Sequence, residues 1–180
     1  WDAHGHDEHN DSHDEAVFSS TLWTNTVELF VERPYLVANE PAKAMFHVTI
    51  TADGSPMREG KLRFAADGPS PAAVEASLEE PAQPGLFVAT LVFAAPGQYR
   101  ASLTLGGPQI EGGEETIELP PWVVYADEAE ALAAARRDDA DGGSAETICL
   151  LKEQQWRTGL LTTRVEPRAV VQRLTAPGRV

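Results

Sequence analysis

The chain has 180 residues, of which 42% are hydrophobic, so it can bury the core of one full domain and part of a second. Its 28 acidic residues outnumber its 14 basic ones and give a formal net charge of −14, which argues against nucleic acid as a partner. No apolar run approaches the roughly 18 residues of a membrane-spanning helix, and the single cysteine, Cys149, excludes an intramolecular disulfide.

Residues 1–20 form a polar tail without apolar periodicity, and we expect this tail to be disordered without a ligand. It combines four histidines with acidic residues and contains no Lys or Arg. Neutral imidazole suits zinc and copper, and carboxylates complete such coordination shells. The candidate metal ligands are His4, His6, His9, His13, Asp7 and Asp11.

The irregular spacing of these ligands predicts weak capture of Zn²⁺ or of Cu⁺/Cu²⁺ as a transported or sensed ion, with no cofactor required. A solubilising spacer and the remnant of an engineered tag are the alternatives for this tail.

Residues 21–125 indicate an all-β, immunoglobulin-like sandwich of seven strands. Short apolar or alternating runs follow one another at nearly regular spacing, separated by Gly, Pro and Asp turns. The pair Pro120-Pro121 in the last run requires a sheet edge or a break. The cysteine pair and the core tryptophan between the sheets that mark an antibody-type domain are not expected here. The runs cover residues 27–31, 44–50, 61–64, 73–78, 86–93, 99–105 and 116–125.

Residues 126–144 are predicted to form an alanine-rich helix, to about residue 140, followed by a linker. The last segment, 145–180, predicts a short helix over 148–156 and strands over 160–165 and 170–174. Two strands and a short helix make no independent core. We therefore expect residues 145–180 to be an incomplete second β domain, so that the chain is a fragment.

The sequence contains no catalytic motif, and the protein is predicted not to be an enzyme. Within the sandwich, His47 shares a strand face with Met45 and Thr49, which makes it a second, weaker candidate for a soft metal ion. The alternative is a histidine that faces solvent. Trp156 is expected to be the apolar anchor of the short helix that contains it.

The runs Leu150–Trp156, Thr162-Thr163 with Val165, and Ala176–Val180 resemble the opening segment of periplasmic adaptor proteins, the HlyD-like membrane fusion proteins of resistance–nodulation–division efflux pumps. The His/Asp-rich tail is similar to that of the subset linked to heavy-metal export. The turns at Asp53–Pro56, Pro84–Phe87 and Pro96–Tyr99 look like those of an extra N-terminal domain found in some of these adaptors.

The resemblance implies a Gram-negative periplasmic protein that bridges an inner-membrane pump permease and an outer-membrane channel, anchored through a segment preceding this chain. It also implies that residues 145–180 begin the membrane-proximal and β-barrel domains. A stand-alone periplasmic metal-binding or metallochaperone-like domain is the alternative, and an adhesion or carbohydrate-binding module is a third. The last segment is expected to bury Leu160, Val165, Val171 and Leu174 against the sandwich or against a second copy, and the alternative is a frayed segment. We favour the second copy, in a domain-swapped or strand-paired dimer, and therefore expect self-association.

Overall fold

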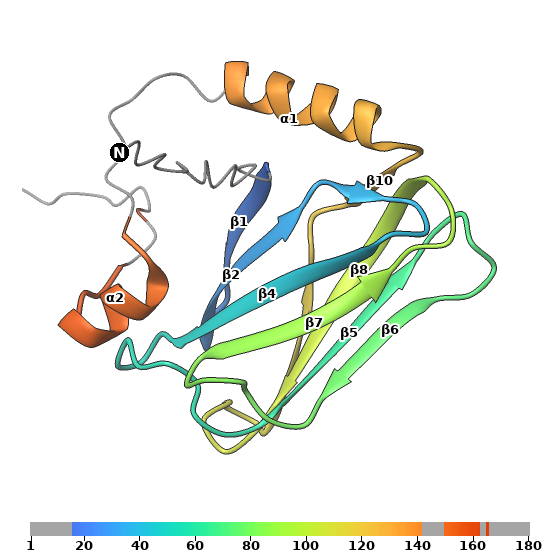
Figure 1. Cartoon of the computed structure of the whole chain (residues 1–180). Helices are drawn as coiled ribbons and strands as arrows, with labels where there is room; N and C mark the ends of the chain where they lie inside the picture. Colours follow the sequence, from blue (N-terminus) through green and yellow to red (C-terminus); the bar gives the residue numbers. More distant parts are fainter. Residues whose placement is uncertain (1–15, 142–149, 163–164, 166–180) are drawn as a thin grey trace, which may run out of the picture.

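A computed structural model describes residues 16–141, 150–162 and 165 of the chain, which contain ten β-strands and two α-helices (Figure 1). The strands form two sheets arranged as a sandwich, which confirms the all-β prediction. All strand pairs are antiparallel except β3 with β10. The first sheet, sheet A, has the order β1 (Val17–Trp23), β2 (Val27–Pro34), β4 (Pro41–Ile50) and β7 (Leu86–Val92). The second, sheet B, has the order β3 (Leu36–Val37), β10 (Trp122–Tyr125), β8 (Gly97–Gly106), β5 (Lys61–Asp67) and β6 (Val74–Leu78), and β9 (Glu114–Glu118) also pairs with β8.

The core lies between the sheets and is filled by the alternate side chains of each strand. Its centre is an aromatic cluster to which both sheets contribute. Phe46 of sheet A lies with its ring centroid 5.9 Å from that of Phe64 and 6.5 Å from that of Trp122, both in sheet B. Phe93 and Tyr99 extend the cluster. Trp122 is therefore a core tryptophan, contrary to the sequence analysis.

All the predicted runs are strands, and the break predicted at Pro120-Pro121 is present. β9 ends at Glu118 and β10 begins at Trp122, so these two strands pair with different parts of β8. Proline has no N–H to donate to a sheet, and two in succession end the pairing. Besides this division of the last run, the structure has two strands that were not predicted, β1 and the two-residue β3.

Strand β1 begins at Val17, inside the stretch that the sequence analysis assigns to the disordered tail. The boundary at residue 20 is therefore wrong for residues 17–20. Phe18, Ser20 and Leu22 form the partly buried face of β1. The two hydroxyl residues Ser19 and Ser20 mask the alternation, because a serine on the inner face looks polar in the sequence.

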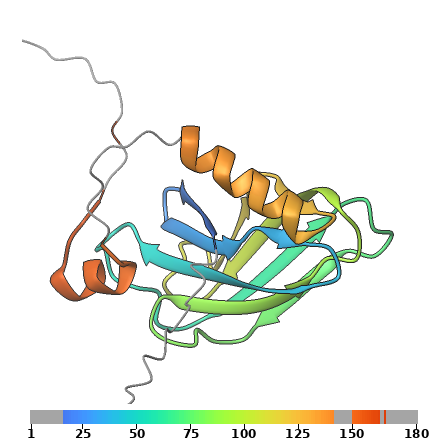
Figure 2. The same ribbon diagram turned by 45° about the horizontal axis from the view of Figure 1, so that its top comes forward.

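Helix α1 (Glu128–Asp141) matches the predicted helix and packs against β3 and β10 (Figures 1 and 2). The helix runs to Asp141, and its last turn contains no basic residue, because Arg136 and Arg137 precede that turn. Neither helix in the described residues is long and apolar enough to cross a membrane.

The last segment is only partly as predicted. Helix α2 (Lys152–Thr158) lies within and just beyond the expected helix. Residues 160–162 and 165 are not in a strand, so the strand predicted over 160–165 is wrong for these residues. Leu160 and Val165 are 49% and 93% exposed, so the sandwich of the same chain does not bury them as predicted, and their burial against a second copy stays a prediction. Val171, Leu174 and Cys149 lie outside the described residues.

Arg33 is a charged residue on the core side of β2, only 4% exposed. Its guanidinium carbon lies 4.3 Å from the ring centroid of Phe18 and 4.8 Å from that of Trp122. Nη1 donates a hydrogen bond to the carbonyl of Pro34, whereas Nε has no hydrogen-bond partner among the described residues. Desolvation by burial lowers the pKa of Arg33 to about 10, and the nearby Tyr125 and Tyr35 partly oppose this shift.

Candidate functional site

The tail ligands His4, His6, His9, His13, Asp7 and Asp11 lie outside the described residues, and His47 is the one candidate ligand that the structure places. His47 lies on β4 and faces away from the core, as the alternation predicts. It is nevertheless only 4% exposed, because α2 covers this part of sheet A. The solvent-facing alternative is therefore wrong.

Carboxylates lie beside both ring nitrogens of His47. Nε2 lies 2.9 Å from Oε2 of Glu32 on β2, and because a carboxylate only accepts hydrogen bonds, Nε2 is the donor. Nδ1 lies 3.5 Å from Oε1 of Glu153 on α2, within ion-pair range but without a hydrogen bond. The imidazole also contacts the rings of Phe30 and Trp156. His47 thus lies between an acid of the sheet and an acid of the helix.

This arrangement gives little support to the metal assignment at His47. The described residues contain no group of three or more His, Cys, Asp or Glu side chains that could hold a metal ion. Met45 is half-buried beside His47 on the strand. We read the cluster of Glu32, His47 and Glu153 as a contact between helix and sheet.

A buried ion pair joins α2 to β2, one of the two inner strands of sheet A. Nζ of Lys152, at the start of α2, donates to Oε1 of Glu28 on β2, and the side chains of both residues are less than a tenth exposed. Nζ also donates to Oε1 of Gln155, 3.2 Å away, and Thr162 Oγ1 lies 3.4 Å from the second oxygen of Glu28. Each charge has a polar partner besides the other, as buried charges require.

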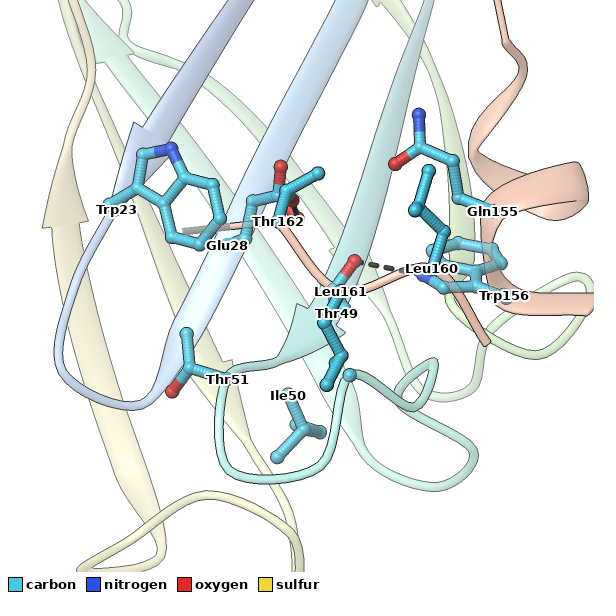
Figure 3. A pocket seen from close by; sticks show the side chains of 11 residues that line it. Trp23, Glu28, Thr49, Ile50, Thr51, Gln155, Trp156, Leu160, Leu161 and Thr162 are labelled. Atoms are coloured by element: carbon cyan, nitrogen blue, oxygen red, sulfur yellow. Dashed lines mark hydrogen bonds between the residues drawn. The ribbon is translucent and has the colours of Figure 1, made fainter. Parts of the chain in front are cut away.

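Trp156 completes the contact, as the sequence analysis expects of an anchor. Its indole Nε1 donates a 2.8 Å hydrogen bond to Thr49 Oγ1, the dashed line in Figure 3. Its ring lies against Gly85, where a Cβ atom would come within 2.5 Å of the indole. Gly85 has φ +82°, so glycine serves both the turn and the close approach of the ring.

A small pocket lies where the segment after α2 meets the sandwich (Figure 3). Trp23, Glu28 and Thr51 line it from the sandwich, and Trp156 and Leu161 line it from the last segment. Leu161 also lies against Gly54, in the turn after β4. The described residues 160–162 therefore continue along the sandwich beyond the end of α2.

The helix owes its stability to this surface. At seven residues, α2 is too short to persist alone in water. Leu151 at its N-cap offers no acceptor, although the side-chain oxygen of Gln154 accepts a hydrogen bond from the Leu151 N–H. Gly159, at φ 67°, ends the helix in the left-handed conformation. The ion pair between Lys152 and Glu28, the indole of Trp156 and the contact of Glu153 with His47 therefore together hold α2 on sheet A.

Four residues of this contact were not predicted as site residues from the sequence: Glu28, Glu32, Lys152 and Glu153. Glu28 and Glu32 stand at outward positions of β2, where an acidic residue is ordinarily solvated. Their sequence positions do not differ from those of solvated acidic residues, and only the position of the helix on this face reveals their role. The arrangement can fix one segment to another; we see no nucleophile and base positioned for catalysis among these residues.

No protein-family model matches the sequence, and no curated protein matches it. Among solved structures, the chain is similar to the soluble domain of PmoD from Methylocystis sp. ATCC 49242. The sequence identity is 18%, the match covers 58% of this chain and 96% of that chain, and the TM-score is 0.38. This likeness is too distant to assign a function.

Proposed function

We propose that this chain is part of a periplasmic adaptor of a tripartite efflux system, in which the sandwich is a non-catalytic assembly module and the N-terminal tail captures the divalent metal ion to be exported. The adaptor bridges an inner-membrane pump permease and an outer-membrane channel. The tail then serves to raise the local concentration of cargo.

The observation that carries the proposal is the docking of α2. The run that resembles the adaptor family, Leu150–Trp156, includes the residues that attach the helix to the sandwich: Lys152 through Glu28, Glu153 through His47, and Trp156 through Thr49. An assembly module must hold a defined orientation toward the segment that follows it. Three separate side-chain contacts supply that orientation, whereas a freely tethered metal collector has no need of it.

Export is tested in the native host. We expect deletion of the gene to raise the metal content of the cells during zinc or copper challenge, and mild cross-linking of the full-length protein to recover both an inner-membrane permease and an outer-membrane channel. Mass spectrometry measures both results. Unchanged metal content together with the recovery of neither membrane protein would contradict the adaptor function.

Metal capture is tested on the 180-residue chain by calorimetry. We expect Zn²⁺ or Cu²⁺ to bind with a Kd of about micromolar or weaker, because ordering a flexible segment offsets part of the binding free energy. Changing His4, His6, His9 and His13 to alanine should abolish the heat. Imidazole ligates only when neutral, so binding should weaken below about pH 6.5. Equal heats from both proteins would exclude the tail histidines as the site.

A further inference from the structure

The outer edge of sheet A is formed by β1, a strand without charged residues in a chain of net charge −14. Its sequence, Val-Phe-Ser-Ser-Thr-Leu-Trp, also lacks proline. Sheet edges that are not meant to pair usually carry a charge, a proline or a covering element. β1 has neither a charged residue nor a proline. Among the described elements, β2 is its one extensive neighbour.

The other edges are protected. β7, the opposite edge of sheet A, lies beside β6 of the second sheet. In sheet B, β3 is only two residues long, β6 carries Glu75, and β9 contains three glutamates. Within the described part of the chain, β1 is therefore the long edge that is left open.

The free hydrogen-bonding groups of β1 can be located. The N–H of Thr24 bonds to the carbonyl of Val27, and these two residues continue the register in which Leu22 lies opposite Leu29. Hydrogen-bonded and non-hydrogen-bonded pairs alternate along an antiparallel ladder. Backbone groups of the other alternate set therefore point to the open edge, namely those of Val17, Ser19, Thr21 and Trp23.

β1 is complementary to a reversed copy of itself. When two copies run antiparallel about Ser20, Val17 lies opposite Trp23 and Ser19 lies opposite Thr21, so every edge-facing residue meets an edge-facing residue. Phe18 then lies opposite Leu22, and Ser20 opposite the Ser20 of the second copy. Apolar side chains pair with apolar ones and hydroxyls with hydroxyls on both faces of the joined sheet.

We propose that β1 is a homodimerisation edge, along which two copies of this chain pair their β1 strands antiparallel about a two-fold axis at Ser20. The two four-stranded sheets then become one continuous sheet. The interface is isologous, as a two-fold axis requires. It also joins two acidic molecules along an uncharged strand, where charge repulsion is least. This edge differs from the C-terminal segment through which the sequence analysis expects self-association.

Sedimentation equilibrium over a concentration series tests the proposal, with the matched variants Thr21→Lys on β1 and Thr90→Lys on β7. Both threonines are exposed and lie on edge strands of the same sheet. The wild-type chain should show a monomer–dimer equilibrium. Thr21→Lys should raise the dimer Kd at least about tenfold, because the charge enters the interface twice, and Thr90→Lys should leave it unchanged. A chain that stays monomeric to about millimolar concentration, or a dimer insensitive to Thr21→Lys, overturns the proposal.

Cross-linking fixes the register. In a Cys149→Ser background, Ser20→Cys places two thiols opposite each other at a non-hydrogen-bonded pair, where Cβ atoms are about 4.5–5.5 Å apart and a disulfide bridge can form. In Ser19→Cys, each thiol lies opposite Thr21 of the second copy, so the two thiols do not face each other. Mild oxidation should give a covalent dimer of the Ser20 variant at least about tenfold faster than of the Ser19 variant. Equal rates would reject the pairing about Ser20.

Discussion

Replacing Lys152 with methionine is expected to release α2 from the sandwich while the two sheets stay folded. The substitution leaves the Glu28 carboxylate buried without its cation, and breaking one partner of a buried ion pair costs about 3–5 kcal/mol. The protein can avoid this cost by undocking α2, which returns Glu28 to water. Since α2 does not persist alone, undocking also unfolds it.

Hydrogen exchange measures the release. Amides of residues 152–158 should lose their protection in Lys152→Met, whereas those of β4 and β8 should keep it. Lys43→Met is the matched control, because Lys43 is an exposed lysine on the outward face of β4. It should change neither region.

The double variant Glu28→Leu with Lys152→Met separates loss of charge from loss of the helix contact. Replacing both members of a buried pair with apolar residues of similar volume is often neutral or stabilising. Protection of α2 should therefore return in the double variant. Full protection in the single variant Lys152→Met would mean that the pair does not hold the helix.

The sandwich could be predicted because its signals are local. Alternation in β2, β4, β5 and β8 has the same period as the strand, and Gly, Pro and Asp residues mark the turns between them. The alternation of apolar and polar residues disappears where a small hydroxyl residue stands on the inner face of a strand. Ser20 in β1 is such a residue. The helix signals of α1 and α2 were equally local and placed both helices to within a few residues.

The contacts of α2 could not be predicted, because they join residues more than a hundred positions apart. Lys152 meets Glu28, and Trp156 meets Thr49, only after the sheet exists. The face of His47 followed from the strand period, but its burial depended on the helix that covers it. The core position of Trp122 was missed for a similar reason: two prolines interrupt the run before it, and only the pairing of β10 with β8 places its side chain in the core.

Trp122→Ala is expected to destabilise the whole sandwich by about 3–5 kcal/mol, the range for removing a buried large aromatic residue. Trp122 is 3% exposed and contacts Phe64, with ring centroids 4.8 Å apart, as well as Phe46 and Phe93. We expect the upper end of the range, because Arg33 loses one of its two aromatic neighbours. Thermal unfolding should move down by more than about 10 °C.

Arg33→Met is the companion variant that tests the origin of this cost. The lowered pKa of Arg33, caused chiefly by desolvation, corresponds to a net cost of about 3 kcal/mol for the buried charged guanidinium, and methionine keeps most of the packing without that cost. Because Arg33 is charged at neutral pH in both the folded and unfolded states, its contribution should not vary between about pH 5 and 8. We expect Arg33→Met alone to be neutral or stabilising.

The double variant Trp122→Ala with Arg33→Met completes the cycle. It should lose less stability than the sum of the single effects, since no cation is then left without its ring. Denaturant unfolding followed by circular dichroism gives the three free energies. Additive effects on the free energy of unfolding would show that Trp122 does not stabilise the buried guanidinium of Arg33. A loss of stability below about 1 kcal/mol in Trp122→Ala would show that Trp122 is not at the centre of the core.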